Sequence, residues 1–219
     1  EGKMKLKRDD ISDRVIQRLT KYLSILHDMK KYEEYINSSE LSKIMNTTSA
    51  QIRRDLSTFG EFGIRGKGYD IENLISIIER ILGIDRINKV ILVGHGKVGE
   101  MLTSNTEVLG KSFNIVEVFD KSPSKVGKEI KDLNIKIKDI KDIDSDLGKI
   151  NVDTAILSVI KEQAQIVTDI LVKNHIKGIL NFTTYKLETP DDVAVVDVNI
   201  SANLQELNFW KDMLKNKGE

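Results

Sequence analysis

The chain has 219 residues and carries 34 lysines and arginines against 34 aspartates and glutamates, so its formal net charge is zero. Hydrophobic residues make up 40% of the chain, which is enough for one large or two small cores. The absence of cysteine excludes disulfides, cysteine-ligated metals and thiol nucleophiles, and three scattered histidines predict no metal site. No apolar run is long enough to span a membrane and no signal-peptide pattern is evident, so a cytoplasmic protein is expected.

The first third of the chain, to about residue 84, predicts mostly helices. Apolar residues recur at helical spacing between Ile11 and Leu26, which indicates a long amphipathic helix. A shorter helix is expected from Ser39, as its N-cap, to Met45. A further helix is expected over residues 71–82, with its apolar residues on one face.

Between them, a second short helix follows a tight break. Thr48 and Gln51 have the spacing of a capping box, and the helix that they begin extends to about Phe59. Ile52, Leu56 and Phe59 are expected to face the core. The residues that this turns outward are Ala50, Arg54 and Ser57, flanked by Gln51, Arg53 and Thr58. Two short helices around a tight turn predict a helix-turn-helix, in which arginine and glutamine can read base edges in the major groove of DNA.

A glycine-rich segment follows this helix. Residues 64–69 predict a small β-hairpin, whose tip Arg65-Gly66-Lys67 would act as a wing beside DNA. From Leu41 to Tyr69 five basic residues stand against two acidic ones, a local charge of 5 − 2 = +3, and basic residues at positions 3, 5, 7 and 8 add to this charge. The alternative interpretation is a helical bundle with a solvated charged face.

The second part of the chain alternates apolar and helical segments, the pattern of a doubly wound parallel α/β sheet. Strands are expected over residues 89–93, 112–119, 152–159, 176–182 and 193–198. Helices are expected from the loop after the first strand to about Leu109, and over residues 161–174. The third part is one helix, residues 201–215, with an apolar stripe formed by Leu204, Leu207, Trp210 and Leu214.

Gly94-x-Gly96-x-x-Gly99 follows a predicted strand and opens a predicted helix, the context that a dinucleotide-binding motif requires. The glycines permit a tight turn, close approach of a pyrophosphate and close packing of helix on strand. Asp120 ends the next strand and could accept both ribose hydroxyls. This carboxylate favours NAD(H) over NADP(H), although the neighbouring Lys121 opposes that preference. The alternatives are a glycine-rich turn without a ligand, or a site for another nucleotide such as coenzyme A.

The histidines suggest no catalysis. His95 lies inside the glycine loop and is expected to be a solvent-exposed turn residue. His27 and His175 lie in or near helices without a partner at useful spacing, and no His, Arg and Asp set for hydride transfer is evident. A protein that is not an enzyme is therefore expected. An NAD-dependent dehydrogenase and a module that binds coenzyme A are the alternatives of other classes.

Together these residues resemble the Rex family of bacterial redox-sensing transcriptional repressors, from about Asp13 onward. The matching stretches are QIRRDLSTFGEFGIRGKGY at residues 51–69, ILGIDR at 81–86, KVG at 125–127 and GILNF at 178–182. The resemblance implies a homodimer with three segments in each chain. These are a winged-helix DNA-binding domain over residues 4–84, a Rossmann NAD(H)-binding domain over 85–199, and a C-terminal helix over 200–219 that is swapped into the partner subunit.

The resemblance also implies a function. The dimer would bind palindromic operator double-stranded DNA when NADH is scarce, and NADH would rotate the subunits and release the DNA. Contacts with DNA are implied for Ser49, Gln51, Arg53, Arg54, Ser57, Arg65, Gly66 and Lys67. Contacts with the cofactor are implied for Gly94, His95, Gly96, Lys97, Val98, Gly99, Asp120, Lys121, Ser158, Val159, Asn181 and Phe182. Dimer contacts are expected for Leu204, Leu207, Trp210 and Leu214.

The chain departs from the family pattern mostly where the cofactor is expected. Family members commonly carry Asp-x-Asp-Pro after the second strand, where this chain has Asp120-Lys121-Ser122-Pro123. Further departures fall at Ser24, Asn105, Ile160, Thr183, Thr184, Asn199 and Ile200. A family member with weakened or altered nucleotide sensing is therefore the second hypothesis within the family.

Overall fold

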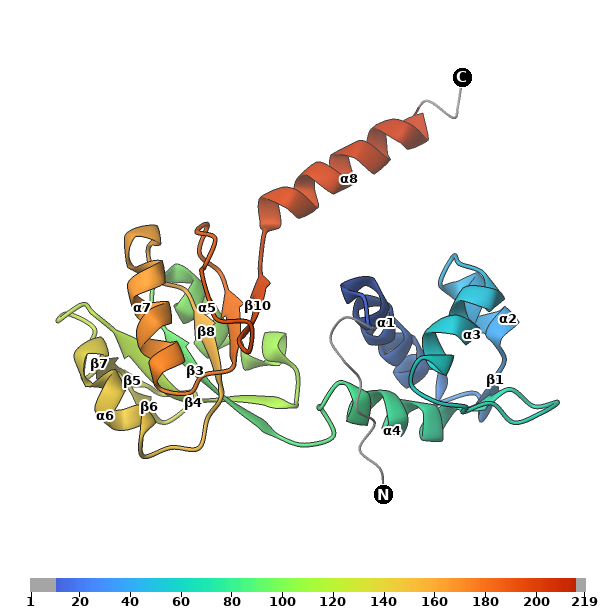
Figure 1. Ribbon diagram of the computed structural model, residues 1–219, viewed down its shortest axis with the longest axis horizontal. Coiled ribbons are helices and arrows are strands. Elements are labelled where there is room, and N and C mark those ends of the chain that lie inside the picture. The colour runs from blue at the N-terminus through green and yellow to red at the C-terminus, as the bar shows by residue number, and fades with distance from the viewer. Residues whose placement is uncertain (1–10, 216–219) are drawn as a thin grey trace. The chain divides into compact units, whose positions relative to one another are not determined.

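The computed structural model describes residues 11–215, so the basic positions 3, 5, 7 and 8 lie outside the described residues. The chain divides into two compact units, residues 1–86 and 87–219 (Figure 1). The first unit contains α1 (Asp13–Met29), β1 (Tyr35–Ile36), α2 (Ser38–Ile44), α3 (Ser49–Ser57), β2 (Tyr69–Asp70) and α4 (Ile71–Ile81). Within the described range, no helix has the length and apolar character needed to cross a membrane.

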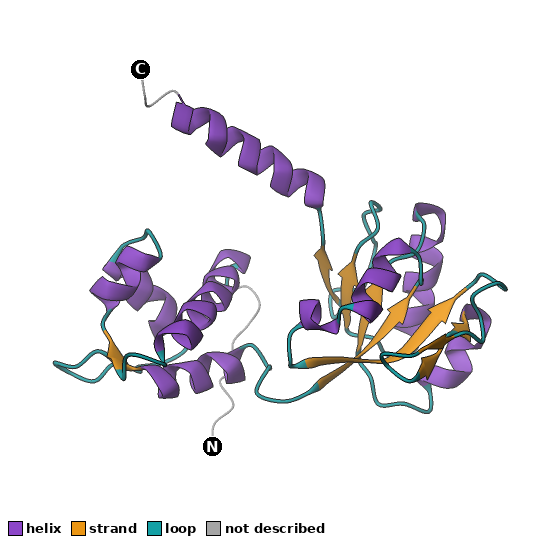
Figure 2. Ribbon diagram, turned by 180° about the vertical axis from the view of Figure 1, so that it is seen from behind, coloured by secondary structure: helices purple, strands orange, loops and turns teal. Residues whose placement is uncertain are grey.

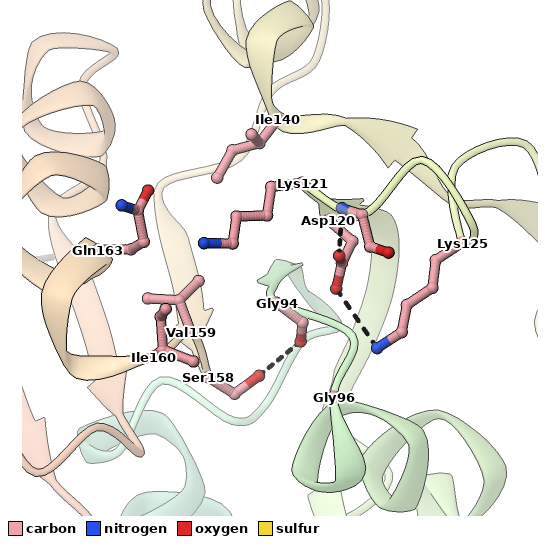
Figure 3. A pocket seen from close by; sticks show the side chains of 11 residues that line it. Gly94, Gly96, Asp120, Lys121, Lys125, Ile140, Ser158, Val159, Ile160 and Gln163 are labelled. Atoms are coloured by element: carbon pink, nitrogen blue, oxygen red, sulfur yellow. Dashed lines mark hydrogen bonds and ion pairs between the residues drawn. The ribbon is translucent and has the colours of Figure 1, made fainter.

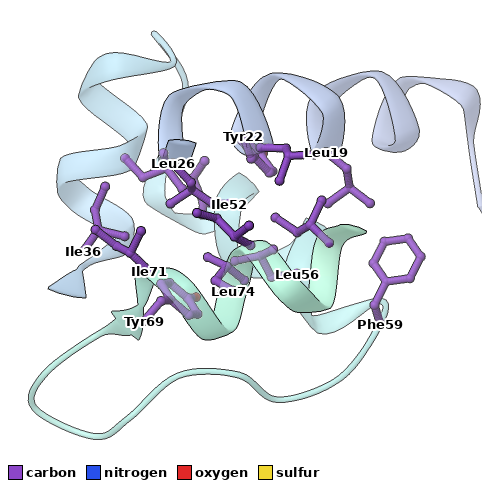
Figure 4. Close-up of a cluster of buried hydrophobic side chains, with 14 residues drawn as sticks. Leu19, Tyr22, Leu26, Ile36, Ile52, Leu56, Phe59, Tyr69, Ile71 and Leu74 are labelled. Atoms are coloured by element: carbon purple, nitrogen blue, oxygen red, sulfur yellow. The ribbon is translucent and has the colours of Figure 1, made fainter. Parts of the chain in front are cut away.

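One apolar cluster holds the first unit together (Figure 4). It joins Leu19 and Leu26 of α1 to Ile52 of α3 and to Leu74 of α4, all 0–1% exposed. Complete burial of each such side chain contributes roughly 1.5–3 kcal/mol. The predicted core face of α3 is confirmed, since Ile52, Leu56 and, just beyond the helix, Phe59 are all buried.

The N-cap of α2 is Asn37, and the prediction of Ser39 is wrong. Asn37 Oδ1 accepts hydrogen bonds from the backbone N–H groups of Ser39 and Glu40 at 2.9 and 3.0 Å. The Glu40 carboxylate accepts from the Asn37 N–H at 3.1 Å. Both reciprocal hydrogen bonds are present, so this is a complete capping box. An amide oxygen caps a helix as well as a hydroxyl does.

The capping box predicted for α3 is only half formed. Thr48 Oγ1 accepts from the Gln51 N–H at 3.2 Å, but the Gln51 side chain donates to Asp55, one turn further along the helix. The helix ends at Ser57 and not at Phe59, whose ring packs into the core beyond the last turn.

The hairpin predicted over residues 64–69 is reduced to a tight turn closed by a single antiparallel bridge between Ile64 and Gly68. The strand β2 pairs antiparallel with β1, a two-residue strand too short to show a period in the sequence. Gly68 has φ +95°, and a Cβ there would lie 2.5 Å from the Ile36 carbonyl oxygen. Glycine at this position therefore lets the turn pass against β1.

The second unit is built on a parallel sheet. Its elements are β3 (Asn88–Val93), α5 (Lys97–Ser104), η2 (Thr106–Leu109), β4 (Phe113–Asp120), β5 (Glu129–Ile130), β6 (Ile135–Lys136), β7 (Lys138–Asp139), η3 (Ile140–Asp142), α6 (Ile143–Leu147), β8 (Thr154–Leu157), α7 (Lys161–Lys173), β9 (Gly178–Asn181), β10 (Ala194–Asp197) and α8 (Ile200–Lys215). Six strands pair in the order β10-β9-β8-β3-β4-β7. Figure 2 shows the strands of this sheet with helices beside them. Numbered along the chain, this order is the doubly wound arrangement 6-5-4-1-2-3, which confirms the predicted fold class.

Helices cover both faces of this sheet. From β3, Ile91 and Val93 join the cluster that includes α6 and α7. Val90 and Leu92 alternate with them and pack with Leu102 of α5 on the other face. Burial on both sides explains why the strand is a continuous apolar run.

Two features of this unit differ from the sequence predictions. The helix after the glycine loop ends at Ser104, well before Leu109, because Asn105 adopts φ −137° and ψ 70°, which no α-helix accepts. Residues 106–109 form a single 3₁₀ turn. The segment 121–153 adds β5, β6, β7 and α6, which the sequence did not indicate because such short elements show no clear period.

Candidate functional site

The doubly wound sheet creates one crevice at a defined point. The strand order reverses between β3 and β8, and ligands of such sheets bind outside the carboxyl ends of the strands there. Gly94 follows β3 and Ser158 follows β8. The Ser158 N–H donates to the Val93 carbonyl at 2.9 Å, and its hydroxyl donates to the Gly94 carbonyl at 2.6 Å. The two loops therefore meet at this edge of the sheet.

The three glycines of the motif meet different requirements. Gly94 has φ +95°, and a Cβ there would lie 2.6 Å from the Ser158 carbonyl oxygen; a Cβ at Gly99 would lie 2.5 Å from the Gly94 oxygen. Gly96 has φ −82° and open space where a side chain would stand. Nothing within residues 11–215 requires glycine at position 96. The residue fits a ligand phosphate that closely approaches the backbone at the N-terminus of α5.

Asp120 fastens this loop from the end of β4. Its two carboxylate oxygens accept from the N–H groups of His95 and Ser122 at 2.7 and 2.8 Å. Lys125 Nζ donates to the His95 carbonyl at 2.5 Å and lies 3.9 Å from the Asp120 carboxylate. Each carboxylate oxygen keeps a further lone pair, so Asp120 can still accept ribose hydroxyls.

The expectation of an exposed His95 is wrong, because its ring folds back over α5 and is buried. Its Nε2 lies 3.0 Å from the Thr103 hydroxyl, which donates to the Gly99 carbonyl at 3.0 Å. Burial lowers the pKa of His95, which favours the neutral ring. His27 also has a partner, since its Nε2 lies 3.3 Å from the Glu79 carboxylate of α4. His27 and Glu79 lie far apart in the sequence, so no spacing pattern indicated this pair.

A cavity of about 260 Å³ lies beside the glycine loop (Figure 3). Six of the residues implied for the cofactor line it, namely Gly94, Gly96, Asp120, Lys121, Ser158 and Val159. Two of the departures from the family pattern, Ser122 and Ile160, line it as well. Sequence reasoning missed three further lining residues, Lys125, Ile140 and Gln163. Ile140 belongs to η3 and Gln163 to α7, and only the fold brings these elements to the glycine loop.

The other residues implied for the cofactor lie outside this cavity. Val98 and Phe182 line a second hollow of about 510 Å³ at the start of α8. Four departures from the family pattern, Thr183, Thr184, Asn199 and Ile200, line the same hollow. Neither of these two cavities is lined by His95, Lys97, Gly99 or Asn181.

Asn181 is buried at the end of β9, and its amide is fully engaged. The nitrogen donates to the Tyr185 carbonyl at 3.0 Å and to the Asp197 carboxylate at 2.7 Å. The oxygen accepts from the N–H and the hydroxyl of Thr183 at 2.9 and 2.6 Å. Asn181 therefore joins the ends of β9 and β10, and its implied contact with a cofactor stays a prediction.

The face of α3 opposite the core carries most of the residues predicted to bind DNA. Ala50, Arg53, Arg54 and Ser57 are exposed. Arg53 Nη1 donates to Ser38 Oγ at 2.9 Å, which ties the guanidinium to the start of α2. The Arg54 guanidinium makes no hydrogen bond or ion pair within residues 11–215. It is therefore available to contact a base or a phosphate.

The turn after α3 is also exposed and basic. Arg65, Gly66 and Lys67 are all exposed, and Gly66 has φ +83°. Lys67 Nζ lies 5.0 Å from the centre of the Tyr35 ring, within the range of a cation–π contact. This contact holds the tip of the turn beside β1.

Asp55 is a residue that sequence reasoning missed. It is 1% exposed on the inner face of α3, and its carboxylate binds Arg18, Tyr22 and Gln51. A carboxylate next to Leu56 on a buried helix face was the available signal, since a buried charge requires partners.

Every residue of α8 from Ile200 to Lys215 is exposed. The side chains of the predicted stripe, Leu204, Leu207, Trp210 and Leu214, are 55–70% exposed. Phe209 and Met213, which sequence reasoning missed, are also exposed, and the Phe209 ring lies edge-on to the Trp210 ring with the ring centroids 5.2 Å apart. On a helix of 3.6 residues per turn these side chains continue the stripe around the helix, and so broad an apolar surface requires a partner to cover it.

Two family models match the chain. The model described as a putative DNA-binding protein N-terminus matches residues 10–57, and the model described as a CoA binding domain matches residues 85–185. The first match spans α1 to α3, and the second spans the sheet through β9.

Relatives named redox-sensing transcriptional repressor Rex match almost the whole chain. The protein of Caldicellulosiruptor saccharolyticus is 39% identical over 93% of this chain and 92% of its own length. The protein of Clostridium botulinum is 40% identical over 92% of this chain and 95% of its own length. Both names describe regulators rather than enzymes.

Crystal structures of RSP, a Rex-family repressor, match 95% of this chain. RSP in complex with β-NAD⁺ and operator DNA is 34% identical, with a TM-score of 0.85 over 98% of that chain. RSP in complex with β-NADH is 32% identical, with a TM-score of 0.83 over 99% of that chain. On this identity and coverage, the chain belongs to the Rex family of redox-sensing transcriptional repressors.

Proposed function

We propose that this chain is a transcriptional repressor that binds operator DNA and senses the NADH/NAD⁺ ratio, with NADH binding releasing the DNA. The observation that carries the proposal is the presence of two sites in one chain. A glycine loop fastened by Asp120 lies in the second unit, and an exposed basic helix face lies in the first. RSP, which matches both units, was solved with β-NAD⁺ and operator DNA together.

Different parts of the cavity bind different parts of the nucleotide. Gly94 and Gly96 with the N-terminus of α5 hold the pyrophosphate, and Asp120 accepts the ribose hydroxyls. A carboxylate at that position repels a 2′-phosphate, so NAD(H) is the proposed ligand in preference to NADP(H). Bound NADH or NAD⁺ supplies the difference in redox state, and the chain itself carries out no hydride transfer in this proposal.

The DNA half assigns base and phosphate contacts to exposed residues. Arg54 and Ser57 lie at the centre of the outward face of α3, and Arg53 flanks them. Arg65 and Lys67 act from the turn, where Gly66 permits close approach of the backbone to a narrow minor groove. Neutral net charge with a local basic face fits a specific contact better than general coating of nucleic acid.

We propose the same division of the chain that the sequence indicates. A winged-helix DNA-binding domain spans residues 4–84, an NAD(H)-binding domain spans 85–199, and a C-terminal segment over 200–219 supports a homodimer. The partner subunit would cover the exposed apolar sides of α8. Two-fold symmetry would place the recognition helices in major grooves roughly 34 Å apart or a multiple of that distance, so the operator is palindromic.

Release of DNA requires only a difference in affinity between two arrangements of the dimer. The affinity of NADH must be higher for the arrangement that does not fit the operator than for the arrangement that does. A tenfold ratio between the two affinities corresponds to about 1.4 kcal/mol of coupling. The departures that line the two cavities, such as Ser122 and Thr183, are where altered sensing would arise.

The test is fluorescence anisotropy of a labelled AT-rich inverted-repeat duplex at fixed salt, with a random duplex as control. The protein is added alone, with NAD⁺, with NADH and with coenzyme A. Tight binding that is lost with NADH alone supports the redox repressor. Binding that is indifferent to NAD⁺ and NADH supports altered sensing, and loss with coenzyme A alone reassigns the ligand. No preference for the repeat, or turnover of an alcohol or 2-hydroxy acid with NAD⁺, contradicts the proposal.

A further inference from the structure

The buried carboxylate of Asp55 lies directly behind the helix face proposed to meet DNA. Its neighbours Ile52 and Leu56 are core residues, so the carboxylate stands on a face of α3 that is otherwise apolar. A charge taken out of water is tolerated only when hydrogen bonds and an opposite charge replace the lost hydration. The arrangement of those partners indicates the role of the Asp55 carboxylate.

Four hydrogen bonds converge on the two carboxylate oxygens. Oδ2 accepts from Arg18 Nε and from the Tyr22 hydroxyl, both at 2.5 Å. Oδ1 accepts from Arg18 Nη2 and from Gln51 Nε2, both at 2.7 Å. The bidentate contact with Arg18 fixes the orientation of the carboxylate as well as its charge.

The protonation state of this cluster follows from the same contacts. Burial by itself would raise the pKa of Asp55, but the hydrogen bonds from Arg18, Tyr22 and Gln51 outweigh burial and lower it. The pKa of Arg18 is raised, chiefly by its hydrogen bond with Asp55. The cluster is therefore an ion pair at neutral pH.

The cluster connects one turn of α1 to α3. Arg18 and Tyr22 lie four residues apart on the same face of α1, and Asp55 lies near the end of α3. Apolar contacts alone are not directional, whereas a fork of four hydrogen bonds resists rotation of α3 about its axis. That rotation decides which of Arg53, Arg54 and Ser57 face outward.

Gln51 belongs to the cluster and not to the outward set. Its side-chain nitrogen is held by Asp55, one helical turn away, and the residue is half-buried. The neighbouring Arg54 is exposed and unpaired within the described residues. Although glutamine is a residue that can read adenine, its amide here is already engaged.

We infer that Asp55 is a positioning residue that sets the rotation of the recognition helix, and that Gln51 acts through Asp55 and does not read a base. This inference rests on the proposed DNA binding. Arg54 then remains the principal side chain on α3 that distinguishes one base from another.

The test compares Gln51→Ala and Tyr22→Phe in the full-length protein, with Gln17→Ala and Tyr32→Phe as matched controls on exposed positions. Affinities are measured for the operator duplex, for single-base-pair variants of it and for a random duplex. The temperature is one at which circular dichroism shows every variant folded. Tyr22→Phe removes a single hydroxyl on the side of the cluster that lies on α1, so any effect on DNA binding must pass through Asp55.

We expect both cluster variants to weaken operator binding by about three- to tenfold, the effect of one lost hydrogen bond. The order of preference among the duplexes and the affinity for random DNA should stay unchanged. Arg54→Ala should instead remove preference at one base pair, with a loss of about 5- to 150-fold. The controls should bind as the wild type does.

Two results would overturn the inference. If Gln51→Ala abolishes preference at one base pair, Gln51 reads that base. If Gln51→Ala and Tyr22→Phe lower only the melting temperature and leave operator affinity intact, the cluster is merely structural. A wild-type protein that ignores the operator duplex would contradict the proposed function itself, which separates the two failures.

Discussion

Single residues in this protein show how one amino acid type can meet unrelated requirements. Gly94 is needed because of its positive φ and a close backbone neighbour, whereas Gly96 has an ordinary φ and free space around it. The first requirement is internal to the fold. The second points to a ligand, because only a molecule outside the protein would occupy the space of a side chain.

Substitution of these two glycines should therefore separate stability from nucleotide binding. Gly96→Ala should change the free energy of unfolding by about 1 kcal/mol or less, yet weaken NADH binding at least about tenfold because a methyl group enters the phosphate site. Gly94→Ala should destabilise the fold by more than about 3 kcal/mol, since a strained φ and an overpacked contact add together.

Calorimetric titration with NADH and urea denaturation of both variants provide the measurement. Equal loss of stability in the two variants would contradict the assignment of Gly96 to a ligand. Unchanged NADH affinity in a folded Gly96→Ala protein would contradict it as well.

The free energy of unfolding should depend on pH through Asp55. Its pKa is lower in the folded protein than its ordinary value, because hydrogen bonds from Arg18, Tyr22 and Gln51 outweigh burial. The stability that it contributes is therefore present above about pH 4 and is lost as the pH falls through its folded pKa. Asp55→Asn should cost about 3 kcal/mol near pH 7, because Arg18 then loses its ion-pair partner.

The cost of Asp55→Asn should shrink as the pH falls below about 4, because the unfolded chain then takes up a proton at Asp55 before the folded protein does. Urea denaturation of both proteins between pH 3 and pH 7 measures this difference. Gln17→Ala, at an exposed position on α1 that does not titrate, serves as the control and should show a small, flat difference. A cost for Asp55→Asn that is constant with pH would contradict the ion pair.

At the scale of elements, the helix ends of the first unit are determined by local hydrogen bonds that can be tested individually. Asn37 caps α2 by accepting hydrogen bonds with its side chain, whereas Ser39 lies inside the helix and donates its own N–H to that cap. Asn37→Ala should lower the free energy of unfolding by about 1 kcal/mol. Ser39→Ala should leave it unchanged or slightly raised, because alanine has the better helix propensity.

Thermal and urea unfolding of Asn37→Ala and Ser39→Ala distinguish the two assignments of the cap. A larger loss for Ser39→Ala than for Asn37→Ala would restore the boundary predicted from the sequence. Thr48→Ala provides a reference, since Thr48 caps α3 with one hydrogen bond.

At the scale of the whole molecule, α8 leaves large apolar side chains exposed over a broad part of its surface. Fully covering side chains such as Leu207 and Trp210 contributes roughly 1.5–3 kcal/mol each. Such a surface on a single helix favours association with a second copy of the chain, in keeping with the proposed homodimer.

Charge placed on α8 should therefore break the assembly. Leu207→Glu combined with Trp210→Glu should convert a dimer to a monomer at micromolar concentration, because two carboxylates would be buried without partners. Operator affinity should fall by more than about a hundredfold, since one half-site contact replaces two. Sedimentation velocity and operator titration measure both effects.

The control for α8 is Gln205→Ala, a change on the same helix that adds no charge. A double variant that remains dimeric would contradict the role of α8. A wild-type protein that sediments as a monomer would contradict the homodimer itself.

The sequence by itself determined the order of the elements, the doubly wound sheet, the core face of α3 and the glycine motif with Asp120. These are local properties, because helical and strand periods and turn residues lie within a few positions of each other. The same reasoning predicted the apolar stripe of α8 that contains Leu207. It did not indicate short elements such as β1 and β7, whose few residues show no period.

Only the tertiary structure decided which distant residues meet. The partners of Asp55 and His27 lie on other helices, and Gln163 reaches the cavity from α7. Burial of His95 likewise depends on how its ring folds over α5. Such contacts depend on how the elements pack, and packing depends on the whole set of side chains at once, so no spacing along the chain encodes them.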